Sequence, residues 1–90
     1  MMNRVFMTGK VEARPQIVYT PRGEKFMVFP LRVTDGDFLI DVECRGDSSE
    51  PYVDAAVGSS VMVSGMLVRK KLQAREMVKL KVHKIFWMEE

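Results

Sequence analysis

The stretch KFMVFPLRVTDGDFLIDVEC, residues 25–44, decides the fold. Apolar and polar residues alternate through Lys25–Val33 and again through residues 38–44, and a period of two is typical of a β-strand with one buried face. Between the two runs stands Thr34-Asp35-Gly36-Asp37, which is rich in turn-forming residues. We therefore predict a β-hairpin. Its buried face carries Met27, Phe29, Leu31, Val33, Phe38, Ile40, Val42 and Cys44.

The same alternation extends outward from this hairpin in both directions. It predicts one strand before the hairpin, over residues 4–11, and two longer strands after it, over residues 60–69 and 77–88. A basic link, residues 70–76, joins the last two strands. Pro30 lies on the outward face of its own strand, which favours an edge position or a bulge there.

Residues 48–57 are the one segment with helix signals. Ser49 suits the N-cap, Pro51 suits the first helical position, and Gly58 ends the segment. The predicted order is then three strands, a short helix and two strands. A helix between strands three and four of a five-stranded Greek-key barrel describes the OB-fold, an all-β architecture that binds oligonucleotides. The alternative, a five-stranded SH3-like barrel, has no natural place for this helix.

Composition indicates one globular domain. The chain has 90 residues, of which 47% are hydrophobic and 29% charged, so we predict a single domain over residues 1–90. No apolar run approaches the ~20 residues that cross a bilayer. The N-terminus lacks the apolar segment of a secretory signal, and the single Cys44 cannot form an internal disulfide. We expect a cytoplasmic protein that meets no membrane.

Positive charge is concentrated toward the C-terminus, although the net charge is only +2. Residues 68–84 hold seven Lys or Arg and one Glu, whereas residues 35–50 hold six of the twelve carboxylates and one Arg. The C-terminal third is therefore the part best suited to an anionic partner.

Motifs of an enzyme or a metal site are absent from the sequence. It contains no Gly-rich phosphate loop and no GxSxG. The single His83 has no Cys or carboxylate at metal-ligand spacing, and the acidic residues scatter over a turn and a strand. We therefore expect a binding protein, without a cofactor or a metal, and not an enzyme.

Several short fragments stand in a specific order and spacing: Asn3-Arg4-Val5, Gly9, Val11, Pro15, Pro21-x-Gly23, Phe29-x-Leu31 and Gly58-Ser59-x-Val61-x-Val63-x-Gly65. In this the chain resembles the bacterial single-stranded DNA-binding (SSB) family, and within it the short PriB group of primosomal replication proteins. The resemblance implies an OB-fold that binds single-stranded DNA in replication and replication restart. It also implies a homodimer paired through the first strand, and a primosomal helicase or other replication proteins as further partners.

Single-stranded DNA binding needs cations along the phosphate backbone and aromatic rings on which bases stack. The family uses the link between the last two strands and the first loop, so both regions supply candidates. Along the link and the last strand they are Arg69, Lys70, Lys71, Arg75, Lys79 and Lys81. In and beside the first loop they are Arg14, Tyr19, Arg22 and Lys25. On the central hairpin they are Phe26, Arg32 and Phe38.

The outward apolar residues leave another interpretation open. Phe6 interrupts an otherwise polar face of the first strand, and with Arg4 and Thr8 it forms the predicted dimer interface. If Phe6, Phe26 and other outward residues bind a different protein instead, the chain is an OB-fold interaction module without nucleic-acid binding. A third alternative is an RNA-binding OB-fold, although the clustered aromatic patches of cold-shock strands are missing. Trp87 is predicted to be a barrel plug or an interface anchor.

Overall fold

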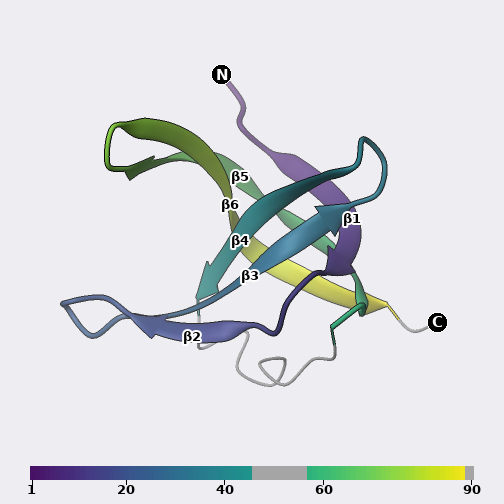
Figure 1. Cartoon of the computed structure of the whole chain (residues 1–90), viewed down its shortest axis with the longest axis horizontal. Helices are drawn as coiled ribbons and strands as arrows, with labels where there is room; N and C mark the ends of the chain where they lie inside the picture. Colours follow the sequence, from purple (N-terminus) through teal and green to yellow (C-terminus); the bar gives the residue numbers. More distant parts are fainter. Residues whose placement is uncertain (46–56, 89–90) are drawn as a thin grey trace.

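Six β-strands form one sheet that closes on itself in the computed structural model, which describes residues 1–45 and 57–88 (Figure 1). The strands are β1 (Val5–Val11), β2 (Gln16–Tyr19), β3 (Lys25–Val33), β4 (Phe38–Arg45), β5 (Ser60–Leu72) and β6 (Arg75–Met88). Their order in the sheet is β1-β5-β6-β4-β3-β2, and an additional pairing of β1 with β3 closes it. The chain therefore has the predicted OB-fold. The helix predicted over residues 48–57 lies outside the described residues, except for Val57, which is in a turn.

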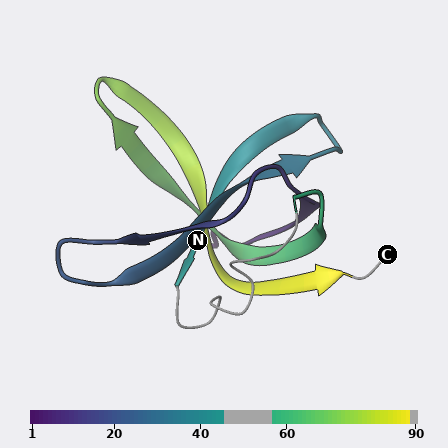
Figure 2. The ribbon, with the colours of Figure 1, turned by 60° about the horizontal axis from the view of Figure 1, so that its bottom comes forward.

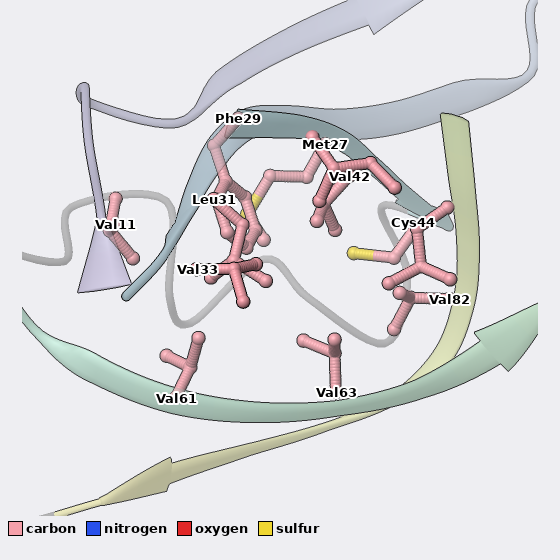
Figure 3. Close-up of a cluster of buried hydrophobic side chains, with 12 residues drawn as sticks. Val11, Met27, Phe29, Leu31, Val33, Val42, Cys44, Val61, Val63 and Val82 are labelled. Atoms are coloured by element: carbon pink, nitrogen blue, oxygen red, sulfur yellow. The ribbon is translucent and has the colours of Figure 1, made fainter. Parts of the chain in front are cut away.

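The barrel interior is filled by the inward-facing residues of five strands. They are Val11, Met27, Phe29, Leu31, Val33, Ile40, Val42, Cys44, Val61, Val63, Leu80 and Val82. Figure 3 shows Val61 and Val63 of β5 pointing toward the side chains of β3 and β4. The alternation predicted for the central hairpin is confirmed, except that Phe38, the first residue of β4, is 42% exposed. Trp87 packs against this core, as predicted for a barrel plug.

The four-residue strand β2 was not predicted, and it explains the position of Pro30. β3 pairs with β2 through residues 25–28 and with β1 through residues 31–32, so Pro30 lies where β3 changes partner. The Pro30 carbonyl accepts a hydrogen bond from the Glu12 N–H at 2.9 Å. The nitrogen of an extended residue points to the same side as its carbonyl, so the missing N–H faces the connection between β1 and β2. β3 is an internal strand with an unbroken register against β4, so the expected bulge is absent there, and the expected edge exists only locally, where neither β1 nor β2 pairs with Pro30.

A bulge in β6 changes which of its residues face the core. β5 and β6 pair continuously up to Ser64↔Lys84 and resume at Gly65↔Val82, which leaves His83 as an extra residue. A Cβ on Gly65 would lie 2.8 Å from the Val82 Cα. Because no side chain fits at that distance, glycine is required opposite the bulge.

The predicted basic link over residues 70–76 is not a flexible loop. β5 continues to Leu72 and β6 begins at Arg75, so only Gln73 and Ala74 form the turn. Residues 68–72 of β5 and 75–79 of β6 form a two-stranded arm, which in Figure 2 extends away from the barrel, as the β2–β3 and β3–β4 hairpins also do. The cations of this segment therefore stand on a regular hairpin, where successive side chains point to opposite faces.

Candidate nucleic-acid interface

A cleft of about 440 Å³ lies over the outward face of β3 and β4. Its floor carries two apolar residues of β3, Val28 and Pro30, opposite two carboxylates of β4, Glu43 and Asp41. These residues face outward because they alternate with the core residues of the same strands. The cleft therefore lies on the outward face of the central hairpin, although Phe26, Arg32 and Phe38, the binding residues predicted there, are not among its lining residues.

The strand order sets the two sides of the cleft. β2 flanks β3 on one side, and β6 flanks β4 on the other. The side beside β3 is formed by the connection from β1 and by β2, through Ala13, Arg14, Gln16 and Val18. The opposite side is the arm, which contributes Lys70 and Lys79. Among the predicted binding residues, the structure thus brings Arg14, Lys70 and Lys79 into one cleft.

The cations of the arm are divided between its two faces. The cross-strand pairs Lys70↔Met77 and Val68↔Lys79 place both lysines on the face toward the cleft. Arg75 and Lys81 share that face by the same alternation. The pairs Arg69↔Val78 and Lys71↔Glu76 place the other two cations on the opposite face. The six predicted cations of this segment therefore do not share one face.

The two lysines of the cleft are already paired with its two carboxylates. Lys70 Nζ lies 3.0 Å from Asp41 Oδ2, and Lys79 Nζ contacts Glu43 Oε2. The second pair is the more shielded, since the side chains of Lys79 and Glu43 are 28% and 18% exposed. The parallel pairing of β4 with β6, which places Glu43 beside Lys81, brings these distant segments together. The sequence predicted both lysines but gave no binding role to either carboxylate.

Two further predicted cations have acidic partners outside the cleft. Arg69 Nη1 donates to Glu76 Oε1 at 2.8 Å. Arg32 donates two hydrogen bonds to Glu12, at 2.8 and 3.3 Å, and one to Asp37 at 3.3 Å. The hydrogen bond from Arg32 lowers the pKa of Glu12, and the same bond raises the pKa of Arg32. Arg32 therefore links β3 to the residue that follows β1 and to the β3–β4 turn.

The predicted aromatic residues lie on different surfaces. The pair Val18↔Phe26 places the half-buried Phe26 on the outward face, beside the cleft, whereas Tyr19↔Lys25 points to the other face of the β2–β3 hairpin. Tyr19 is 67% exposed there. Phe38 begins β4, directly after the β3–β4 turn, and Arg22 lies in the β2–β3 turn. Only Phe26 is thus next to the cleft floor.

The outer face of β1, β5 and β6 is a second exposed surface. Phe6 is 69% exposed and pairs with Ser64, and Thr8 is exposed and pairs with Met62. Arg4 Nη1 lies 3.1 Å from His83 Nε2. The apolar residues of this outer face are Phe6, Met62, Phe86 and Met88. The sequence singled out Phe6 alone, because the bulge that turns Phe86 outward is not visible in the alternation.

The sequence matches no protein-family model, and no curated protein matches it. Solved structures do resemble it. The single-stranded DNA binding protein of Thermus aquaticus superposes with a TM-score of 0.86 at 20% identity, covering 99% of this chain and 41% of that one. A deletion mutant of that protein gives a TM-score of 0.85 at 22% identity.

A second likeness spans both chains almost completely. The N-terminal domain of the PriB protein from Thermoanaerobacter tencongensis, a dimeric structure, gives a TM-score of 0.77 at 22% identity and covers 98% of each chain. The chain spans less than half the length of the Thermus protein but nearly all of the PriB domain. At these identities the likeness is one of fold, and the chain shares the OB-fold of these SSB and PriB structures.

Proposed function

We propose that the chain is a single-stranded DNA-binding protein of the SSB/PriB type that acts in replication and replication restart. The observation that carries this proposal is the cleft over β3 and β4, which is bordered by a cationic arm in a barrel with the fold of SSB and PriB. An OB-fold binds nucleic acid by combining cations along the strand with aromatic platforms. Phe26 beside the cleft supplies such a platform.

The phosphate contacts are assigned to the cations that no described carboxylate neutralises. These are Lys71 and Arg75 on the arm and Lys81 in the adjoining part of β6, for which no ion pair forms among residues 1–45 and 57–88. Arg22 in the β2–β3 turn likewise forms no ion pair with the described residues. Lys70 and Lys79 can contact a phosphate only after they release Asp41 and Glu43, with which they form ion pairs. Binding of the backbone is therefore expected along the arm and the β2–β3 turn, with bases directed toward the cleft.

We further infer a homodimer paired through Phe6 and Thr8 of β1 and through Arg4, which directly precedes it. β1 pairs with β3 only at Lys10 and Val11, so the rest of that edge of β1 has no partner strand among the described residues. The related PriB structure is dimeric. Single-stranded DNA, a second copy and replication proteins such as a primosomal helicase are the proposed partners. A cytoplasmic location accords with them, and the described residues contain no helix able to cross a membrane.

The test of this function is a titration with fluorescent oligonucleotides of equal length: single-stranded DNA, single-stranded RNA and duplex DNA. We expect strongly salt-dependent binding that prefers single strands, because pairing hides the base faces that aromatic rings need. Equal binding of the duplex would mean that charge alone acts. If neither single strand bound at low salt, the proposed function would be wrong. It would leave the interaction-module alternative, which the exposed apolar residues on the outer face of β1, β5 and β6 favour.

A further inference from the structure

Two ion pairs join the arm to β4 beyond the point where their backbones pair. The parallel pairing of β6 with β4 ends at Leu80, and the arm begins at the residue before it. From the arm, Lys79 contacts Glu43, and Lys70 Nζ lies 3.0 Å from Asp41 Oδ2. Both carboxylates belong to the floor of the cleft. The two lysines that line the cleft are therefore held by the barrel itself.

A carboxylate and a phosphate compete for the same lysine side chain. Both are anions that accept charge-assisted hydrogen bonds from an ammonium group, and the ammonium acts on either one as a compact point charge. A lysine that is paired with a carboxylate offers little net charge to an incoming phosphate, which is also repelled by the carboxylate oxygens beside it. Phosphate contact in the cleft therefore requires that the carboxylate be displaced.

The two ion pairs differ in how far solvent screens them. The side chains of Lys79 and Glu43 are 28% and 18% exposed, whereas those of Lys70 and Asp41 are 36% and 50% exposed. Water and salt weaken an exposed ion pair more than a shielded one. Glu43 should therefore hold its lysine against a phosphate more firmly than Asp41 does.

We infer that Asp41 and Glu43 are autoinhibitory residues, which restrain DNA binding by occupying the two cleft lysines in place of the phosphate backbone. This inference rests on the proposed function, because it assigns a regulation to the same DNA site. The restraint acts on backbone contacts, so it is the same for every base sequence. In the parent chain the backbone is bound mainly by the cations that no described carboxylate neutralises, and Lys70 and Lys79 add little.

The affinity for oligo-dT, measured over a range of salt concentrations, tests the inference. The double variant Asp41→Asn/Glu43→Gln keeps the shape of both side chains and frees both lysines. We expect it to bind more tightly than the parent at low salt, on the order of tenfold, since two partly shielded ion pairs no longer oppose binding. Its slope of log affinity against log salt should be steeper by about 0.7 for each lysine that gains a phosphate. Glu43→Gln alone should give the larger part of the gain.

A variant with the same net charge as the parent shows whether the lysines act. Asp41→Asn/Glu43→Gln/Lys70→Gln/Lys79→Gln removes both ion pairs and leaves the net charge unchanged. Its salt slope should equal that of the parent. A parent slope as steep as that of the double variant would mean that the lysines bind phosphates with the carboxylates in place. A double variant no steeper than the fourfold variant would mean that the lysines reach no phosphate. Either result overturns the inference and leaves the proposed function intact.

Asp35→Asn is the matched control for Asp41→Asn, because both replace one aspartate with asparagine. Asp35 is exposed in the β3–β4 turn, outside the cleft, and forms no ion pair with the described residues. Asp41→Asn should steepen the salt slope, and Asp35→Asn should leave it unchanged. Equal effects would mean that only the total charge matters, which overturns the inference.

Two further outcomes are separated by the same titrations. If the double variant melts too low to be measured, Asp41→Asn and Asp41→Asn/Lys70→Gln give the same comparison at the more exposed pair, and equal slopes for these two overturn the inference. Failure of the parent and of every variant to bind oligo-dT overturns the proposed function, and the inference with it.

Discussion

Single residues at close backbone contacts fix the shape of the barrel. Asn3 shows this at the start of β1: its side-chain amide donates to the Leu67 carbonyl at 2.8 Å and accepts from the Leu67 N–H at 3.1 Å. The side chain thus extends the β1–β5 hydrogen bonding by one further pair of bonds, near the point where β5 leaves the barrel to form the arm. Asn3 belongs to the fragments that resemble the SSB family, and this pair of hydrogen bonds gives it a structural role.

The first prediction concerns the effect of replacing Gly65 on stability. Replacing it with Ala would place a Cβ 2.8 Å from the backbone atoms Lys81 C and Val82 Cα, and backbone cannot move as a flexible side chain can. We expect Gly65→Ala to lower the free energy of unfolding by about 1–3 kcal/mol, as overpacked sites do. Denaturant titration measures the change. Met66→Ala, at the next and exposed position, should change it by much less, and an equally stable Gly65→Ala would show that the bulge yields easily.

The contact of Glu12 with Arg32 gives a prediction of pH dependence. The pKa of Glu12 is lowered by its hydrogen bond to Arg32. At acidic pH the folded chain therefore binds fewer protons at this carboxylate than the unfolded chain does. The contact stabilises the fold fully above the ordinary Glu pKa and is lost as the pH falls through the lowered value. The stability advantage of the parent chain over Glu12→Gln should therefore be present at neutral pH and shrink in acid. An advantage that is constant with pH would contradict this.

At the scale of elements, the sequence predicted the strands and turns that neighbouring residues specify. The central hairpin, its turn and its core residues were predicted because alternation and turn residues are properties of neighbouring positions. β2 was missed because Gln16–Tyr19 is too short to show alternation between Pro15 and Pro21. The cleft could not be predicted from local patterns, since it depends on the parallel pairing of β4 with β6. Only that pairing brings the carboxylates of β4 to the lysines of the arm.

The arm is the element whose role in binding is most directly testable. The double variant Lys71→Ala/Arg75→Ala removes two exposed cations near its turn that no described carboxylate neutralises. It should weaken oligo-dT binding, and each lost phosphate contact should reduce the slope of log affinity against log salt by about 0.7. The melting temperature should stay within a few degrees of the parent, because exposed charges contribute little stability.

A neutral pair on the same arm supplies the control for that variant. Arg69→Ala/Glu76→Ala removes an ion pair, so the net charge of the arm is unchanged. Its salt slope should remain near that of the parent. If the two double variants had the same slope, the cations of the arm would not contact the DNA backbone. The proposed path along the arm would then be wrong.

The whole molecule presents two separate surfaces. The cleft over β3 and β4 carries paired charges and an apolar floor, whereas the outer face of β1, β5 and β6 carries the exposed apolar side chains Phe6, Phe86 and Met88 among polar ones. The core strands lie between these surfaces. The two proposals, DNA binding and dimerisation, do not compete for the same residues.

Dimerisation is the prediction that belongs to this scale. Phe6 is 69% exposed on a strand whose second edge pairs with β3 only at Lys10 and Val11, so pairing with a second β1 would satisfy backbone groups and bury the ring. We expect sedimentation velocity to show a dimer at micromolar concentration. Phe6→Glu should raise the dissociation constant at least about tenfold, since it places two like charges in the interface. Leu39→Glu, an exposed apolar residue on β4, should leave the dimer intact. A parent chain that sediments as a monomer would refute the dimer.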